Sequence, residues 1–220
     1  MNELLLIVEI AVVFSAVLLS KKFFGKTGLF VWIAIAAIVA NLQTAKNIDL
    51  FGLQATLGTV MFASTFLATD ILNECYGMKE SKKGVFIGLF AVVIFLVSTQ
   101  LMLLFQPNGL DMVNGSMQTL FGLNLRICVS SVAMFFLANL VDVYLFEKLK
   151  KKFDGKKLWL RNNISTIVCN GIENFLFVLF AFIGIYSIGD VLIIGLTTTI
   201  IEVIVALCDT PFLYAAKRMK

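Results

Sequence analysis

Histidine is absent from the 220 residues of this sequence. That absence excludes imidazole metal ligands, histidine general bases and Ser-His-Asp triads. Charged residues are also scarce, at 15% against about 25% in soluble domains. The four cysteines lie in separate apolar segments with no CxxC pair, which favours small buried side chains over a metal or disulfide site. Without a Walker motif, a dinucleotide-binding motif or a nucleophile beside a base, the sequence predicts no enzyme, no metal and no cofactor.

Apolar residues, by contrast, make up 60% of the chain, with 21 phenylalanines, and the mean hydropathy is +0.95. A soluble domain of this size buries only about 70% of its unfolded surface and cannot hide so much apolar area. The composition therefore excludes a soluble globular domain and, more firmly, a disordered chain. It predicts an all-α, polytopic integral membrane bundle. The net charge of +4 is typical of the basic inner loops of such proteins and does not indicate nucleic-acid binding.

Seven apolar segments, separated by charged residues, glycine or proline, predict about seven transmembrane helices in one transmembrane domain, residues 1–220. The break between the sixth and seventh segments, near 184–190, is the weakest, and a re-entrant turn is the alternative there. The segments are residues 3–20, 28–45, 54–76, 84–106, 120–148, 160–187 and 189–215.

Basic residues occur mainly in alternate breaks between these segments. If Lys21, Lys22 and Lys26 lie inside, sixteen of the 18 basic residues lie on the inner side, and Lys46 alone falls in an outer loop. The positive-inside rule predicts this excess of Lys and Arg in the cytoplasmic loops, and the opposite orientation would place the excess outside. We therefore expect the N-terminus outside and the C-terminus inside.

The sixth segment carries a polar stripe at membrane depth, where an ionisable group costs roughly 2.5–3.5 kcal/mol. At about 100° per residue, the stripe occupies an arc of about 100° on one helix face. Such a face predicts a substrate site inside the bundle, in which amides donate and accept while the carboxylate takes two N–H donors or one cation. A helix-packing stripe is the alternative, although packing alone does not need so many polar groups. Its members are Asn163, Thr166, Asn170, Glu173 and Asn174.

Neighbouring segments supply further candidates. Glu202, near mid-depth in the seventh segment, is predicted to be a second ligand, a proton-coupling carboxylate or the partner of Arg126. Phe62 and Phe66 share one face of the third segment, and Asn41 marks either an entry site or the outer end of the second. Gating or structural roles are expected for a second set: Asp70, Asn73, Arg126, Asp142 and Asp209.

Two local expectations concern the inner end of the bundle. Glu74 is interpreted either as a member of a close carboxylate pair with Asp70, one helical turn away, or as an inner cap that faces Lys79 or Lys82. Residues 209–211, Asp-Thr-Pro, predict an irregularity near the inner end of the last helix, because proline disrupts helical hydrogen bonding.

Four motifs follow one another along the chain. Residues 66–77 read Phe-Leu-Ala-Thr-Asp-Ile-Leu-Asn-Glu-Cys-Tyr-Gly, and residues 140–146 read Leu-Val-Asp-Val-Tyr-Leu-Phe before a basic loop. Residues 159–166 contain Trp-Leu-Arg-Asn-Asn and Ser-Thr, and residues 209–212 read Asp-Thr-Pro-Phe. Together they resemble the YhhQ-type queuosine precursor transporter family, also described as vitamin-uptake transporters. The resemblance covers roughly 28–220 and implies a six-helix core, with residues 1–27 as an added N-terminal helix and loop.

This resemblance implies import of a 7-deazaguanine base (preQ0, preQ1 or queuine) for tRNA modification inside the cell. The family commonly has Asp-Thr where this chain has Glu173 and Asn174, which leaves the exact precursor open. A guanine-like edge offers two parallel N–H donors that match one carboxylate, and its carbonyl accepts from an amide. Glu173 with Asn170 or Asn174 is expected to supply that set.

Under the same resemblance, Phe62, Phe66 or Phe177 is expected to stack on the purine ring, and Glu202 to meet the aminomethyl cation of preQ1. We therefore expect a multi-pass importer in the bacterial cytoplasmic membrane, with a modified purine base as substrate and the lipid bilayer around it. Proton coupling and a homodimer stay open. One alternative is the substrate-binding S-component of an energy-coupling-factor vitamin transporter, with an ATPase partner docked on Ala36 and Ala40. A membrane enzyme or assembly factor is a weaker alternative.

Overall fold

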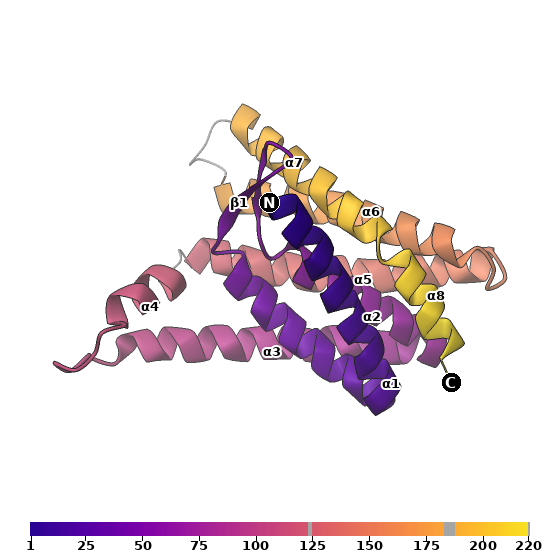
Figure 1. The fold of residues 1–220 in the computed structure, drawn as a ribbon, viewed down its shortest axis with the longest axis horizontal. Coiled ribbons are helices and arrows are strands. Elements are labelled where there is room, and N and C mark those ends of the chain that lie inside the picture. Colours follow the sequence, from indigo (N-terminus) through magenta and orange to yellow (C-terminus); the bar gives the residue numbers. More distant parts are fainter. Residues whose placement is uncertain (123–124, 183–187, 220) are drawn as a thin grey trace.

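The computed structural model describes residues 1–122, 125–182 and 188–219, and it confirms the predicted all-α class (Figure 1). Long helices pack side by side, and one small antiparallel hairpin lies at an end of the bundle. The elements in chain order are α1 (Asn2–Gln43), β1 (Asn47–Leu50), β2 (Leu53–Thr56), α2 (Thr59–Tyr76), α3 (Met78–Leu104), α4 (Asn114–Phe121), α5 (Leu125–Lys152), α6 (Leu158–Phe182), α7 (Ile188–Leu207) and α8 (Thr210–Arg218).

Helix α1 is two helices joined by a sharp kink. Gly25 has φ 59° and ψ −139°, a backbone conformation that glycine adopts without the strain of a Cβ atom. The chain then doubles back so tightly that a Cβ on Gly28 would lie 2.2 Å from the carbonyl oxygen of Ser20. We call residues 2–24 the first arm and residues 26–43 the second arm. The kink accounts for the predicted break between the first two segments.

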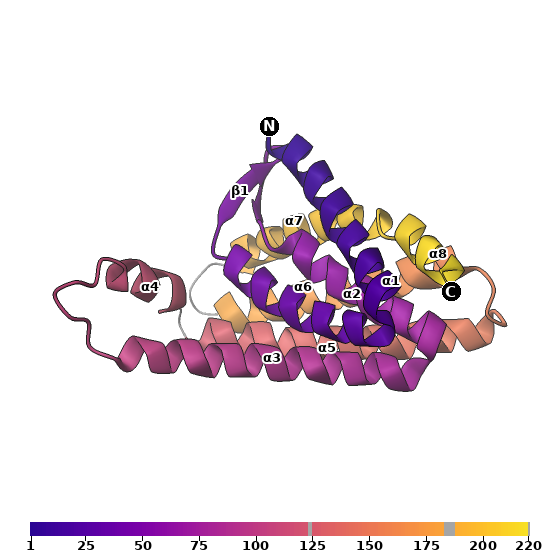
Figure 2. The same ribbon diagram turned by 60° about the horizontal axis from the view of Figure 1, so that its bottom comes forward.

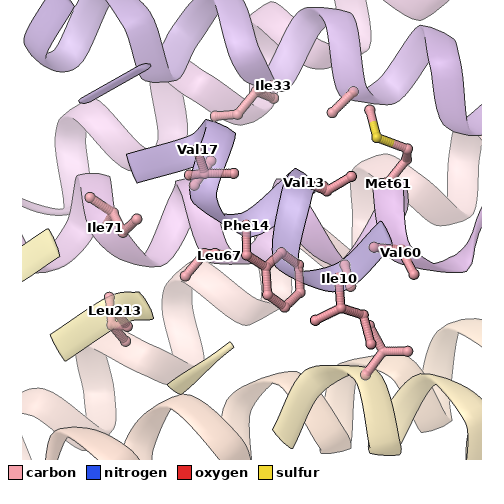
Figure 3. Packing of buried hydrophobic residues seen from close by; sticks show 14 of the residues in the cluster. Ile10, Val13, Phe14, Val17, Ile33, Val60, Met61, Leu67, Ile71 and Leu213 are labelled. Atoms are coloured by element: carbon pink, nitrogen blue, oxygen red, sulfur yellow. The ribbon is translucent and has the colours of Figure 1, made fainter. Parts of the chain in front are cut away.

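The first arm is part of the hydrophobic core (Figure 3). Phe14 and Val17 are fully buried and belong to one cluster with Leu67 of α2 and Leu213 of α8. The ring of Phe14 packs edge-to-face on Phe212, with the ring centroids 5.4 Å apart. The arm before residue 28 therefore packs into the same core as the later helices.

Helix α2 is the central helix of the bundle. Most of its side chains between residues 59 and 73 are buried, and it packs against α1, α3, α5, α7 and α8. Gly84 of α3 permits close approach, since a Cβ there would lie 2.9 Å from the Leu72 side chain. Because other helices surround α2, its polar residues are shielded from lipid. The second arm is enclosed on one face only: Ala36 and Ala40 are buried, so they offer no exposed docking face to an ATPase subunit, whereas Val31 and Ile35 are exposed.

The two ends of the bundle differ in character (Figures 1 and 2). The N-terminus, the hairpin and α4 lie toward one end, where the Asn2 amide donates to the Asp49 carbonyl at 3.0 Å. The kink of α1, the α5–α6 loop and the C-terminus lie toward the other. There Lys21 donates to the Ala216 carbonyl, and Lys26 lies 3.4 Å from Glu80. We call this second end the basic end.

The helix breaks follow the predicted segments closely. Helix α7 ends at Leu207 and α8 begins at Thr210, which confirms the irregularity predicted at residues 209–211. Residues 183–187, where the weakest break was predicted, lie outside the described residues. The hairpin and α4 were not predicted. Phe51 and Gly52 both have positive φ, as in a two-residue hairpin turn, so residues 53–56 pair with β1 and do not begin the third segment.

Length and hydropathy identify three described helical stretches that could cross a membrane: Asn2–Gln43, Met78–Leu104 and Thr198–Arg218. Asn2–Gln43 has 42 residues, about twice the length that one crossing needs. The structure therefore agrees with a helical membrane protein. The count of seven spans and the orientation stay predictions.

Candidate functional site

The polar face of α6 meets α7 at a pair of acidic side chains. Asn174 donates to a carboxylate oxygen of Glu202 at 2.6 Å, and both side chains are buried. Glu173, the preceding residue, interacts electrostatically with Glu202, so the two carboxyl groups lie near each other. One oxygen of Glu173 is buried with no hydrogen-bond partner in the described part of the chain. We call Asn170, Glu173, Asn174 and Glu202 the carboxyl site.

Unpartnered oxygens continue along the same face of α6. Thr166 and Asn170 are each 1% exposed, and both the Thr166 hydroxyl and the Asn170 carbonyl oxygen lack a partner among the described residues. With Glu173 they form a row in which helical spacing keeps each oxygen on one face. Buried polar atoms are normally hydrogen-bonded, so such a row is suited to a ligand that brings N–H donors.

Aromatic rings of α2 lie beside this face. Phe62 packs edge-to-face on Phe66, with centroids 5.3 Å apart, and on Phe135 of α5 at 5.7 Å. Phe66 is fully buried and clusters with Cys169, the residue before Asn170. Phe62 is only partly buried, so of these two predicted stacking rings it has more surface left to offer.

Two predicted site residues are not placed with the carboxyl site. Asn41 donates to the carbonyl oxygen of Ala37 at 2.8 Å, within its own helix, which favours the simpler reading that it ends the second arm. Arg126 falls in the first turn of α5, but its side chain lies outside the described residues. Its pairing with Glu202 therefore stays a prediction.

Three aspartates form a second polar group, nearer the basic end, which we call the aspartate cluster. Asp70 of α2, Asp142 of α5 and Asp209 at the α7–α8 junction are all 0% exposed. Asp70 and Asp142 lie within hydrogen-bonding reach of each other, and Asp209 interacts with both. Asn162 of α6 donates to Asp209 at 2.6 Å. Residues predicted separately for gating are thus brought together.

Glu74 is the centre of an ionic network at the basic end. Its carboxylate lies 2.9 Å from Arg161, 2.6 Å from Lys217 and 3.5 Å from Lys150. The expected cap with Lys79 or Lys82 is wrong, because Lys82 instead donates to the hydroxyl of Tyr144 at 2.6 Å. The Glu74 network joins α2, α5, α6 and α8. Asn73, beside it, donates to the Val143 carbonyl at 3.2 Å and so also holds α2 against α5.

Arg161 and Asn162 take part in these polar groups but were not among the predicted site residues. Arg161 is fully buried, with its guanidinium 5.0 Å from the centre of the Phe146 ring. Because Arg161 lies at the start of a helix beside many loop lysines, the sequence analysis counted it only among the basic residues of the inner side. Its place in the 159–166 motif and directly before two asparagines was the available signal.

Comparison with known proteins identifies the family of this chain. The family model described as "Putative vitamin uptake transporter" matches residues 56–216, which includes both the carboxyl site and the aspartate cluster. The chain belongs to this family. No solved structure gives a significant match.

Two curated relatives are named "Probable queuosine precursor transporter". The one from Bacillus subtilis (strain 168) is 42% identical over 207 residues, covering 94% of this chain and 90% of that protein. The one from Haemophilus influenzae is 27% identical over 135 residues, covering 60% of this chain and 54% of that protein. The chain is therefore a membrane transport protein and not an enzyme, as the sequence predicted.

Removing Arg161 should destabilise the protein strongly. The substitution Arg161→Leu leaves Glu74, whose side chain is only 4% exposed, without its most buried partner. Breaking a buried ion pair in this way typically costs about 3–5 kcal/mol. We expect a large fall in the thermal unfolding midpoint of the detergent-solubilised protein, partly restored in the double variant Arg161→Leu, Glu74→Leu.

The matched control is Lys151→Ala. Lys151 is 3.8 Å from Glu147 one helical turn away, and its side chain is 76% exposed. Exposed pairs of this kind contribute about 0.3–0.5 kcal/mol, so the unfolding midpoint should barely move. A midpoint for Arg161→Leu as high as that of the control would show that the network does not stabilise the bundle.

Proposed function

We propose that this chain imports a queuosine precursor, a 7-deazaguanine base, across the bacterial cytoplasmic membrane for use in tRNA modification. The observation that carries the proposal is the carboxyl site. There a carboxylate oxygen of Glu173, buried and without a partner among the described residues, lies beside amide groups between apolar helices. The relative that covers 94% of this chain bears the matching name.

The chemistry of a guanine-like edge fits the carboxyl site. The ring N–H and the exocyclic amine point the same way and can donate to the two oxygens of Glu173, one of which lacks a partner among the described residues. The base's carbonyl accepts from an amide, and Asn170 supplies one next to Glu173 on the same face. Phe62, partly buried on the neighbouring helix, is positioned to cover a ring face.

Glu202 is the residue proposed to discriminate between precursors with an amino group and precursors without one. Its carboxylate already accepts from Asn174, so it is held by the protein and does not depend on the base. A second carboxylate near the first favours a substrate with an amino group, such as preQ1 or queuine, over the nitrile of preQ0. A cationic amine beside Glu202 is attracted by that carboxylate, while Glu173 accepts from the N–H edge of the base.

The charge distribution supports the proposed topology of seven spans with the N-terminus outside. The basic end gathers the α1 kink, the α5–α6 loop and the C-terminus, all rich in lysine or arginine. The positive-inside rule places that end in the cytoplasm. Substrate then enters from the hairpin end and leaves at the basic end.

The direct test of function is the queuosine content of tRNA. A host that needs an external precursor and lacks its own importer is fed preQ0, preQ1 or queuine separately, with and without this chain. We expect restoration by at least one precursor, most efficiently by one that carries an amino group. The variant Glu173→Gln should raise the precursor concentration needed by about tenfold or more, since charged hydrogen bonds contribute about 1.5–3 kcal/mol.

The control for that variant is Glu147→Gln, the same chemical change at a side chain whose partner is an exposed lysine. It should leave restoration unchanged. Equal restoration by Glu173→Gln and the wild type at limiting precursor, with equal protein in the membrane, would contradict the proposed site. Failure of all three bases with the wild type would contradict the proposed function.

The orientation is tested by labelling cysteines in intact cells. In a background without the native cysteines, Gly109→Cys lies in the loop after α3 and Lys156→Cys in the α5–α6 loop, both exposed. A membrane-impermeant maleimide should label the first in intact cells and the second only after permeabilisation. The reverse pattern would invert the topology, and labelling of both in intact cells would contradict a single crossing between them.

A further inference from the structure

The aspartate cluster has a feature that substrate binding at the carboxyl site does not use. Asp70 and Asp142 come from different helices, are both completely buried, and place their carboxyl groups within hydrogen-bonding reach of each other. An ionised carboxylate only accepts hydrogen bonds. Two such groups can therefore form a hydrogen bond only if one proton lies between them.

Among the described residues, the side-chain donor that the structure shows beside the pair is the Ser165 hydroxyl, which has another acceptor. Both oxygens of Asp70 and both of Asp142 are without a hydrogen-bond partner in the described part of the chain. Ser165 lies beside Asp142, but its hydroxyl donates to the carbonyl oxygen of Asn162 at 3.1 Å. Asp209 differs in this respect, because the Asn162 amide satisfies one of its oxygens at 2.6 Å.

The charges around the pair do not neutralise it either. Asp209 adds a third carboxyl group, and the thiol of Cys169 also faces the pair. Arg161 is the cation that interacts with Asp70, but its guanidinium already forms an ion pair with Glu74. Two buried like charges with one shared counter-ion are costly, and a proton removes that cost.

The pair lies next to the proposed substrate site. Cys169 packs against Phe66 and faces the pair, and the following residue, Asn170, belongs to the carboxyl site. On the other side, Asp209 and Asn162 continue the polar contacts to the α7–α8 junction, where Thr210 accepts from Asn163 at 2.9 Å. Helix α6 thus contributes residues to the carboxyl site and also lies against the Asp70–Asp142 pair.

We propose that the Asp70–Asp142 pair is the proton-binding site that couples proton entry to precursor import, an inference that rests on the proposed transport function. The pair takes up one proton from the outer side and releases it to the cytoplasm in each cycle. Glu202 is less suited to this role, because its carboxylate has an amide donor from Asn174.

The test uses the purified full-length chain in proteoliposomes with the membrane potential clamped to zero. Tritiated queuine and preQ1 are each measured in two assays: accumulation driven by an acidic exterior, and exchange between equal concentrations inside and outside. We expect the wild type to accumulate substrate up to about tenfold per unit of pH gradient, the limit for one proton per substrate. A sodium gradient should not replace the pH gradient.

The decisive variant is Asp142→Asn. An asparagine amide can donate to Asp70 as the shared proton does, so the pair is held in its protonated arrangement. We expect loss of pH-driven accumulation with exchange retained. The matched control is Asp111→Asn in the exposed loop before α4, which should keep both activities.

The outcomes separate the two proposals. If the wild type neither exchanges nor accumulates either base, the transport function itself fails. If the wild type exchanges but ignores the pH gradient or follows sodium, or if Asp142→Asn still accumulates, the proton site is overturned. Loss of exchange in both Asp142→Asn and Asp70→Asn also overturns it, because the residues then serve transport as a whole.

A pH indicator trapped in wild-type vesicles needs no variant: internal acidification on substrate addition supports the proposal, and its absence overturns it.

Discussion

Polar side chains at membrane depth must find their partners inside the protein, because lipid offers no hydrogen bonds. The bundle meets this constraint with two helices. Helix α2 is enclosed by five others, which allows it to carry Asp70 and Asn73 without exposing them. Helix α6 is lipid-exposed on one side and polar on the other, and it turns the polar side toward α7 and α5.

Three polar groups are consequently arranged along α6. The carboxyl site uses residues 170–174, the aspartate cluster touches residues 162 and 165, and the Glu74 network uses Arg161. The last of these ties four helices together at the basic end. Under the proposed import, release of substrate at that end requires these ion pairs to separate.

Under the two proposals, helix α6 contacts both the substrate and the proton-binding pair. Helical spacing puts Thr166, Asn170 and Glu173 on one face. Nearer the start of α6, Asn162 contacts Asp209 and Ser165 lies beside Asp142. A movement of α6 relative to α5 would change both the acceptors offered to the substrate and the distance between the aspartates and their neighbours.

Much of this arrangement was predictable, and the exceptions have physical causes. Lysine clusters, glycines and Pro211 interrupt the apolar runs, so the helices and the α7–α8 break follow from sequence. The polar face of α6 was predicted from its periodicity. The pairing of Glu202 with Asn174 was not, because periodicity gives a face but not the neighbour that covers it.

The sequence did not predict the Asp70–Asp142 contact, the partners of Glu74 or the hairpin. Asp70 and Asp142 are far apart in sequence, so only the packing of α2 on α5 brings them together. Glu74 was assigned to lysines close in sequence, whereas its most buried partner, Arg161, lies in the first turn of another helix. The hairpin was missed because its residues are apolar enough to extend the following helix, and its turn lacks the usual asparagine or aspartate before glycine.

In the proposed site, the carboxylate of Glu173 accepts hydrogen bonds from the N–H edge of a guanine-like base. Equilibrium binding to the purified protein tests this contact most directly. The two ligands are preQ1 and its analogue that lacks the 2-amino group on the pyrimidine ring, and each is measured on the wild type and on Glu173→Gln. We predict that the wild type prefers preQ1 by about tenfold or more, and that the variant loses most of this preference because the amine then has no charged acceptor. Equal affinity of the wild type for both bases, or an unchanged preference in the variant, would contradict the account.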